Sequence, residues 1–203
     1  MTIMIEIDRP APAPVLAPAK QRILDTADVL FYDEGIRAVG VDRLISSSSV
    51  TKATFYKHYG SKDRLITDYV TYRHRQVAQA VADVAAGTDD PGEVLEAMIE
   101  AIIVAIDSPG FRGCPFINAA AEFPEPTHPV RLAVAEHREW YNGVFELLLR
   151  RLGVPLSGER ADDLVLARDG AMSGAYAGDP VAAKAALART FSRITGNVER
   201  ASV

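Results

Sequence analysis

The stretch VTKATFYKHYGSKDRL, residues 50–65, decides the fold prediction, because a helical pattern and an unusual set of polar groups coincide in it. In a helix, Phe55 and Tyr59 lie on one face, where they can dock on a neighbouring helix. We therefore predict a short helix that two aromatic rings anchor and that presents cationic and hydrogen-bonding groups to a partner. Those outward positions are Lys52, Ala53, Tyr56 and Lys57.

The residues before this stretch supply supporting helices. Residues 19–34 have apolar side chains at the spacing of one helix face, and Gly35 follows as a terminal cap. A second short helix is expected after Gly40, and residues 46–49 form the turn that follows it. Two short helices joined by a turn and supported by a longer helix, within about 40 residues, are typical of a helix-turn-helix. Its second helix enters the major groove of DNA, so DNA is the predicted partner.

The distribution of charge supports this prediction, although the net charge of the whole chain is −5. Residues 20–75 carry ten basic against seven acidic side chains, a balance of +3, and they include the stretch 50–65. Residues 76–203 carry eleven basic against eighteen acidic side chains, a balance of −7. This asymmetry is typical of a DNA-binding head on an acidic body.

Composition favours a helical protein of the cytoplasm. Hydrophobic residues make up 48% of the 203 residues and aromatic residues only 7%, as in helices packed on helices. The one cysteine, Cys114, can form no intrachain disulfide, which indicates a reducing compartment. No apolar run reaches the ~18 residues of a membrane span. Residues 1–7 have no basic leader or adequate apolar region for a signal peptide.

The motif in residues 50–65 resembles the end of the DNA-binding domain of TetR-family regulators. That family's usual pattern is Gly-Val-Ser/Thr-x-x-Thr-Leu/Phe-Tyr-x-His-Phe-x-Ser-Lys-x-x-Leu. The resemblance extends back through Ile23, Phe31, Gly35 and Val41. It implies an all-α chain with an N-terminal three-helix DNA-binding domain, which a long helix joins to a C-terminal ligand-binding and dimerisation domain. It further implies a ligand-responsive repressor that binds a pseudo-palindromic operator in double-stranded DNA as a homodimer.

The same resemblance assigns roles in DNA binding. It places Lys52 and Ala53 at base edges, where a lysine can donate to guanine and a methyl group can meet the methyl group of thymine. Thr51 either caps the helix or bonds to DNA. A competing interpretation is that Tyr56 and His58 only complete a small helical core. The expected phosphate contacts are Thr54, Tyr56, Lys57, His58 and Lys62.

Two positions depart from the family pattern. Gly40 stands where the family commonly has Ser or Thr, so a hydroxyl contact with a phosphate is lost. Ser49 replaces the usual glycine of the turn, at a position that often needs a positive φ. A serine there should destabilise the fold by up to ~1 kcal/mol. These departures motivate an alternative function, a ligand-binding or scaffold dimer with a vestigial DNA head.

The rest of the chain is expected to be helical, and Pro/Ala-rich residues 8–18 are expected to form an extended arm. The predicted domains are an arm over 1–18, a DNA-binding domain over 19–65 and an effector-binding and dimerisation domain over 66–203. Ser61 should be the N-cap of the long helix expected over residues 61–85. Expected helices cover residues 61–85, 93–107, a short segment after Pro115, 128–152, 159–177 and 180–200.

The last two helices are the dimer surface that the resemblance implies, with core packing within the chain as the alternative for each residue. Candidate interface residues are Leu164, Val165, Met172, Tyr176, Leu187, Phe191 and Ile194.

The helices between the linker and that pair are expected to enclose an unidentified small-molecule effector. Ordinary packing or surface placement is the alternative for each candidate, and Cys114 in particular is interpreted as a small hydrophobic residue rather than a redox sensor. The candidates are Ile103, Phe111, Cys114, Phe116, Asn118, Glu122, His137, Trp140 and Tyr141.

The sequence predicts neither an enzyme nor a metal or cofactor protein. It contains no His-Glu-x-x-His zinc motif, no Gly-x-Ser-x-Gly nucleophile motif and no glycine-rich phosphate loop. The four histidines are spread along the chain. The expected partners are therefore operator DNA, a small-molecule effector and a second copy of the chain, with no membrane.

Overall fold

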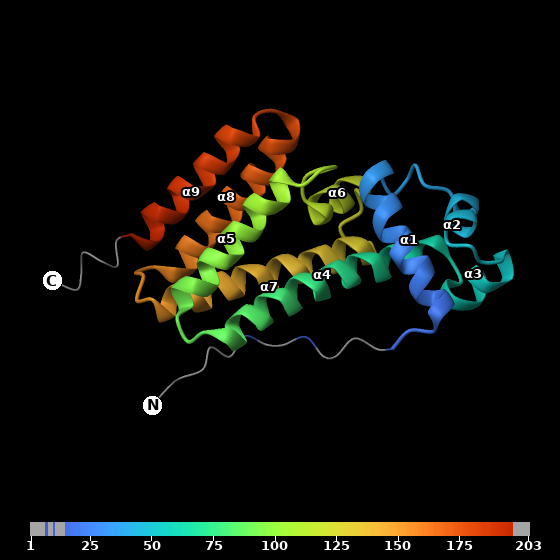
Figure 1. Ribbon diagram of the computed structural model, residues 1–203, viewed down its shortest axis with the longest axis horizontal. Coiled ribbons are helices and arrows are strands. Elements are labelled where there is room, and N and C mark those ends of the chain that lie inside the picture. The colour runs from blue at the N-terminus through green and yellow to red at the C-terminus, as the bar shows by residue number, and fades with distance from the viewer. Residues whose placement is uncertain (1–6, 8–9, 11–14, 197–203) are drawn as a thin grey trace. The chain divides into compact units, whose positions relative to one another are not determined.

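A computed structural model describes residues 7, 10 and 15–196 of the chain, and these residues form helices and no strand. The predicted all-α fold is confirmed (Figure 1). Most of the predicted arm, residues 1–18, lies outside the described residues. The helices are α1 (Pro18–Glu34), α2 (Val41–Ser47), α3 (Lys52–Tyr59), α4 (Lys62–Gly87), α5 (Pro91–Asp107), α6 (Pro115–Glu122), α7 (Pro129–Arg151), α8 (Ser157–Ala177) and α9 (Pro180–Thr195).

The helices belong to two compact units. Residues 15–77 and Pro115–Glu136 form the first, which we call the head unit. Residues 78–114 and 137–196 form the second, the body unit. The head unit contains the whole predicted DNA-binding domain, together with the first part of α4, all of α6 and the start of α7. Compact packing therefore groups α6 with the helix-turn-helix, which the motif alone did not indicate.

The core of the head unit is built on the aromatic rings that the sequence pattern placed inward. Phe55 and Tyr59 of α3 are 0% and 1% exposed, and the Tyr59 hydroxyl donates to the Lys20 carbonyl of α1 at 3.1 Å. The Phe31 ring of α1 packs edge-on against Tyr69 of α4, with centroids 5.5 Å apart. The predicted anchoring of α3 by two rings is confirmed.

Local signals in the sequence set the helix ends of the head unit. Gly35 follows α1 with a φ of 92°, a left-handed conformation that glycine adopts without steric cost. Ser61 accepts a hydrogen bond from the Arg64 amide at 3.2 Å, so it caps α4 as predicted. These ends position α2 and α3 as a helix-turn-helix beside α1.

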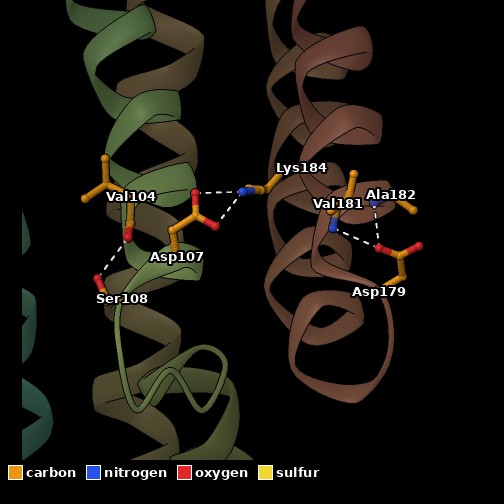
Figure 2. Close-up of polar contacts among 7 residues, drawn as sticks. All are labelled: Val104, Asp107, Ser108, Asp179, Val181, Ala182 and Lys184. Atoms are coloured by element: carbon orange, nitrogen blue, oxygen red, sulfur yellow. Dashed lines mark hydrogen bonds and ion pairs between the residues drawn. The ribbon is translucent and has the colours of Figure 1, made fainter.

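The body unit is organised around α5 and the α8–α9 pair. One face of α5 is buried. α8 and α9 pack side by side (Figure 1). Figure 2 shows how α5 and α9 are joined: Lys184 of α9 forms an ion pair with Asp107 of α5, and Asp179 caps α9 by accepting from the amides of Val181 and Ala182 at 2.9 and 3.0 Å. Among the described residues, no helix is both long and apolar enough to cross a membrane.

Candidate nucleic-acid interface

The turn between α2 and α3 adopts the strained conformation that the sequence predicted. Ser49 has a φ of 53°, in the left-handed region that a residue with a Cβ rarely occupies. The turn is held by the Ser48 hydroxyl, which donates to the Leu44 carbonyl at 2.6 Å, and by the Val50 amide, which donates to Ile45 at 3.3 Å. Neighbouring hydrogen bonds therefore hold Ser49 where the family usually has glycine.

Replacing this serine with glycine should stabilise the protein. We expect Ser49→Gly to raise the free energy of unfolding by about 0.5–1 kcal/mol, because glycine adopts a positive φ without the Cβ clash. Urea unfolding followed by circular dichroism measures the change. The matched control is Ser46→Gly, in the last turn of α2, which should destabilise by up to about 0.5 kcal/mol because glycine has a lower helix propensity than serine. A Ser49→Gly protein no more stable than the parent would contradict the strain assigned to this turn.

The Thr51 side chain caps α3. Its hydroxyl accepts from the Thr54 amide at 3.1 Å and lies 2.9 Å from the Thr54 hydroxyl. Of the two roles left open for Thr51, the cap is present in the structure. The cap leaves the next residues of α3, from Lys52 on, at the exposed start of the helix.

The outward face of α3 carries the side chains that the motif assigned to DNA. Lys52, Ala53 and Lys57 are exposed, and Tyr56 is 44% exposed. The Tyr56 ring meets Phe55 edge-on at 5.4 Å, so its base rests on the core while its outer part faces solvent. Cationic, methyl and phenolic groups thus share one accessible surface of a short helix, as major-groove readout requires.

Three further members of the predicted set are less accessible. His58 and Thr54 are half-buried, between the exposed face of α3 and its core side. Lys62 at the start of α4 is also half-buried, and its ammonium group donates to the Ile36 carbonyl at 2.6 Å. Burial lowers the pKa of Lys62, and the nearby Glu122 and Asp63 partly offset that effect. Lys62 therefore has a structural contact that the motif did not indicate.

The structure adds exposed cations to the surface of the head unit. Arg43 on α2 and Arg64 on α4 are both exposed, and Arg43 pairs with Glu34 of α1 at 3.3 Å. No motif position marks these arginines. The excess of basic residues over 20–75 was the signal that could have led to them.

Comparison with known proteins identifies the family. Residues 23–69 match the family model described as bacterial regulatory proteins, tetR family. A TetR-family transcriptional regulator from Streptomyces coelicolor, solved as a crystal structure, is 36% identical and superposes with a TM-score of 0.83 over 89% of this chain and 95% of that one. The chain belongs to the TetR family.

Two named regulators are also similar to this TetR-family chain. The HTH-type transcriptional regulator LmrA of Bacillus subtilis is 28% identical over 138 residues, which are 66% of this chain and 73% of LmrA. The HTH-type transcriptional activator FasR of Mycolicibacterium smegmatis is 30% identical over 138 residues, 66% of this chain and 60% of FasR. The chain is therefore a TetR-family transcriptional regulator with a DNA-binding helix-turn-helix.

The candidate dimer residues of this TetR-family regulator fall into two groups. Tyr176 is 52% exposed and Phe191 is half-buried. The same helix pair exposes two large apolar side chains that the prediction missed, Leu166 at 68% and Val181 at 72%. The other five candidates are buried inside the chain itself, which was the alternative left open for each: Leu164, Val165, Met172, Leu187 and Ile194.

Four of the candidate ligand-binding residues lie in the body unit around an arginine that the sequence did not indicate. Arg168 of α8 is only 9% exposed, and its Nη1 donates to Sγ of Cys114 at 3.1 Å and to Asp169 at 2.8 Å. Its guanidinium carbon lies 5.3 Å from the centre of the Tyr141 ring. Burial raises the pKa of the Tyr141 hydroxyl. His137 and Trp140 continue this aromatic cluster, with ring centroids 6.0 Å apart.

One donor in this buried cluster has no partner. Nε of Arg168 is buried without a hydrogen bond. Burial alone would lower the pKa of Arg168, but Cys114, Tyr141 and Asp169 raise it above its ordinary value, so the guanidinium group stays charged. An unsatisfied charged donor among aromatic rings is suited to a ligand that brings a hydrogen-bond acceptor.

The remaining candidate ligand residues are placed elsewhere. Ile103 of α5 and Phe111 are half-buried in the body unit. Phe116, Asn118 and Glu122 lie on α6 in the head unit, where Phe116 is buried. The Glu122 carboxylate accepts backbone hydrogen bonds from the segment between α1 and α2 rather than standing alone in a cavity.

Proposed function

We propose that this TetR-family regulator is a cytoplasmic repressor that binds a pseudo-palindromic operator in double-stranded DNA as a homodimer and responds to a small-molecule effector. The observation that carries the DNA-binding part is the two-sided α3. Phe55 and Tyr59 fix the helix in the core, while Lys52, Ala53 and Lys57 remain accessible on its outer face.

The chemistry of these side chains supports a division of roles on DNA. Lys52 is suited to donate to O6 and N7 of guanine, and the methyl group of Ala53 is suited to meet the methyl group of thymine. Phosphate contacts would supply most of the affinity and set the register of the helix in the groove. We assign them to Thr51, Thr54, Tyr56, Lys57 and His58, with Lys62 contributing through the ammonium donors that the Ile36 carbonyl does not use.

A homodimer follows from the small size of one head. One recognition helix contacts only a few base pairs, so two heads on half-sites ~34–36 Å apart supply useful specificity. The α8–α9 pair supports this proposal, because Leu166, Tyr176 and Val181 are large apolar side chains left exposed on it. We propose these three, with Phe191, as the dimer surface.

Effector response is assigned to the buried cluster around Arg168. The unpartnered Nε and the rings of Tyr141 and Trp140 offer one polar contact within aromatic surroundings. We propose that an effector bound there shifts α4, which continues covalently from the body unit into the head unit. Allosteric coupling is typically ~1–3 kcal/mol, enough for a 5–150-fold loss of operator affinity.

A salt titration tests the proposal against the alternative of a vestigial DNA head. The probe is a duplex selected from random DNA by the wild-type protein. The logarithm of the association constant should fall steeply with the logarithm of salt concentration, with a slope of about −0.9 for each phosphate neutralised. A protein that selects no sequence, or whose weak binding has no such slope, would support a ligand-binding or scaffold dimer instead.

In vitro transcription tests the sign of the regulation. Transcription from a promoter that carries the selected sequence should fall when the protein is added. A rise would identify an activator, as the relative FasR is named.

A further inference from the structure

The carboxylate at the end of α6 is hydrogen-bonded to the segment that precedes α2. Glu122 Oε1 accepts from the Ile36 amide at 2.8 Å, and Oε2 accepts from the Arg37 amide at 2.6 Å. The partners are 86 and 85 residues apart along the chain. One carboxylate thus joins two neighbouring backbone donors of the helix-turn-helix region to a helix far along the sequence.

This segment depends on side chains for its hydrogen bonds. α1 ends at Gly35, and the next residue, Ile36, is 2% exposed, so its peptide groups are largely removed from water. Buried backbone groups need partners, and here both come from charged side chains. Glu122 accepts from the Ile36 amide, and the Lys62 ammonium donates to the Ile36 carbonyl at 2.6 Å. Hydrogen bonds to charged groups are the stronger kind.

The end of α6 is also fixed by contacts on its other side. The Arg37 guanidinium carbon lies 5.7 Å from the centre of the Phe123 ring. The Phe123 carbonyl accepts from Arg131 of α7 at 3.1 Å, and the Phe123 ring stacks on His128 with centroids 4.4 Å apart. Glu122 and Phe123 together therefore hold the Ile36–Arg37 segment against the region where α6 ends and α7 begins.

The other end of α6 follows directly in the chain on a residue of the cluster assigned to the effector. α6 begins at Pro115, the residue after Cys114, whose sulfur accepts from Arg168. α6 ends at Glu122 itself. A helix of this length is a stiff connection of about 12 Å. Along the chain, one short helix therefore separates Cys114 from the residue that holds the segment before α2.

We propose that Glu122 is a positioning residue for DNA binding, which holds the segment between α1 and α2 and thereby the orientation of α2 and α3. The proposal rests on the function proposed above. With glutamine in place of Glu122, one of the Ile36 and Arg37 amides loses its acceptor and faces an NH2 group, and Lys62 loses the nearby negative charge. The recognition helix would remain folded, but its angle to the supporting helix would be less well defined.

The test compares Glu122→Gln with Glu125→Gln, which removes the same charge three residues later. Glu125 is exposed, and its carboxylate accepts from the Thr127 hydroxyl on the following loop. We expect Glu122→Gln to bind the selected duplex about tenfold more weakly, which corresponds to about 1.4 kcal/mol. Glu125→Gln should bind as the parent does or slightly more tightly, because it only removes a charge that repels phosphate.

Two further readouts separate positioning from a general loss of structure. Affinity for a duplex of unrelated sequence should change less than twofold in Glu122→Gln, whereas unfolding would weaken both duplexes together. Hydrogen exchange should accelerate at whichever of the Ile36 and Arg37 amides faces the new NH2 group, and stay unchanged at the amides of α3. Glu122→Asp, which keeps the charge on a shorter side chain, should lie between the parent and Glu122→Gln and serves if the glutamine variant does not fold.

The outcomes identify which proposal fails. If the parent selects a sequence but Glu122→Gln binds it as tightly as Glu125→Gln does, Glu122 has no positioning role. An equal loss of affinity for both duplexes would likewise overturn that role and leave only a structural one. If the parent selects no sequence at all, the proposed function fails as well, and the two failures are distinct.

Discussion

A Lys52→Ala, Tyr56→Ala variant should bind the selected operator about a hundredfold more weakly than the parent, since a good base or phosphate contact contributes about 1–3 kcal/mol and two are removed. Both side chains are accessible on α3, and the cap at Thr51 and the buried Phe55 keep the helix in place. Gel-shift titration at fixed salt measures the loss. Nuclease protection of the promoter upstream of the gene that encodes this protein is a second measurement of the same loss.

The control for this variant removes a cation from the body unit. Arg150→Ala takes away an exposed side chain on α7 that pairs only loosely with Glu146, at 3.7 Å. It should leave operator affinity within about threefold of the parent, because a distant exposed charge is screened by salt. Stability should change little in either protein, since exposed substitutions are usually within about 0.5 kcal/mol. A double variant that still protects the promoter would exclude α3 as the recognition helix.

Short-range signals explain why the head could be predicted from the sequence. The rings of Phe55 and Tyr59, the cap at Ser61 and the glycine after α1 each act within a few residues, so the pattern determines the local structure. The positive φ at Ser49 was predicted for the same reason, because the position in the turn requires it whatever residue stands there.

Contacts between distant residues explain what could not be predicted. Cys114 was interpreted as an isolated small hydrophobic residue because only Arg112 is near it in sequence, yet its partner is Arg168, 54 residues away. Glu122 was a candidate ligand contact, and its partners precede it by 85 and 86 residues. No periodicity links such residues, since the fold alone brings them together.

The dimer candidates were difficult for a different reason. The large apolar residues of α8 do not gather on one face of that helix, so helical periodicity cannot separate the side that packs within the chain from the side that faces outward. Leu164 and Leu187 are buried, while Leu166 and Val181 on the same helices are 68% and 72% exposed. Only the folded structure distinguishes the packed side of each helix from its exposed side.

Removing Asp169 should destabilise the body unit far more than removing Arg168. Asp169 joins two cations: Oδ1 accepts from Arg168 at 2.8 Å and Oδ2 accepts from Arg138 at 2.5 Å. The Asp169 and Arg168 side chains are 16% and 11% exposed, so water can replace little of this contact. Asp169→Ala leaves a buried guanidinium group without its carboxylate, and breaking such a pair costs about 3 kcal/mol or more.

Arg168→Met is the matched variant, because it leaves Asp169 paired with Arg138 and keeps most of the apolar volume. We expect it to cost about 1.5 kcal/mol or less, since an apolar residue of similar length can replace a buried ion with little loss. Urea unfolding of both variants at one protein concentration measures the difference, because a dimer's stability depends on concentration. Equal destabilisation by the two changes would mean that Asp169 does not neutralise both arginines. If the asymmetry holds, the charge of Arg168 lowers the stability of the body unit, and Asp169 offsets that loss. A charge that does not stabilise the fold agrees with the effector contact that we propose for the unpartnered Nε.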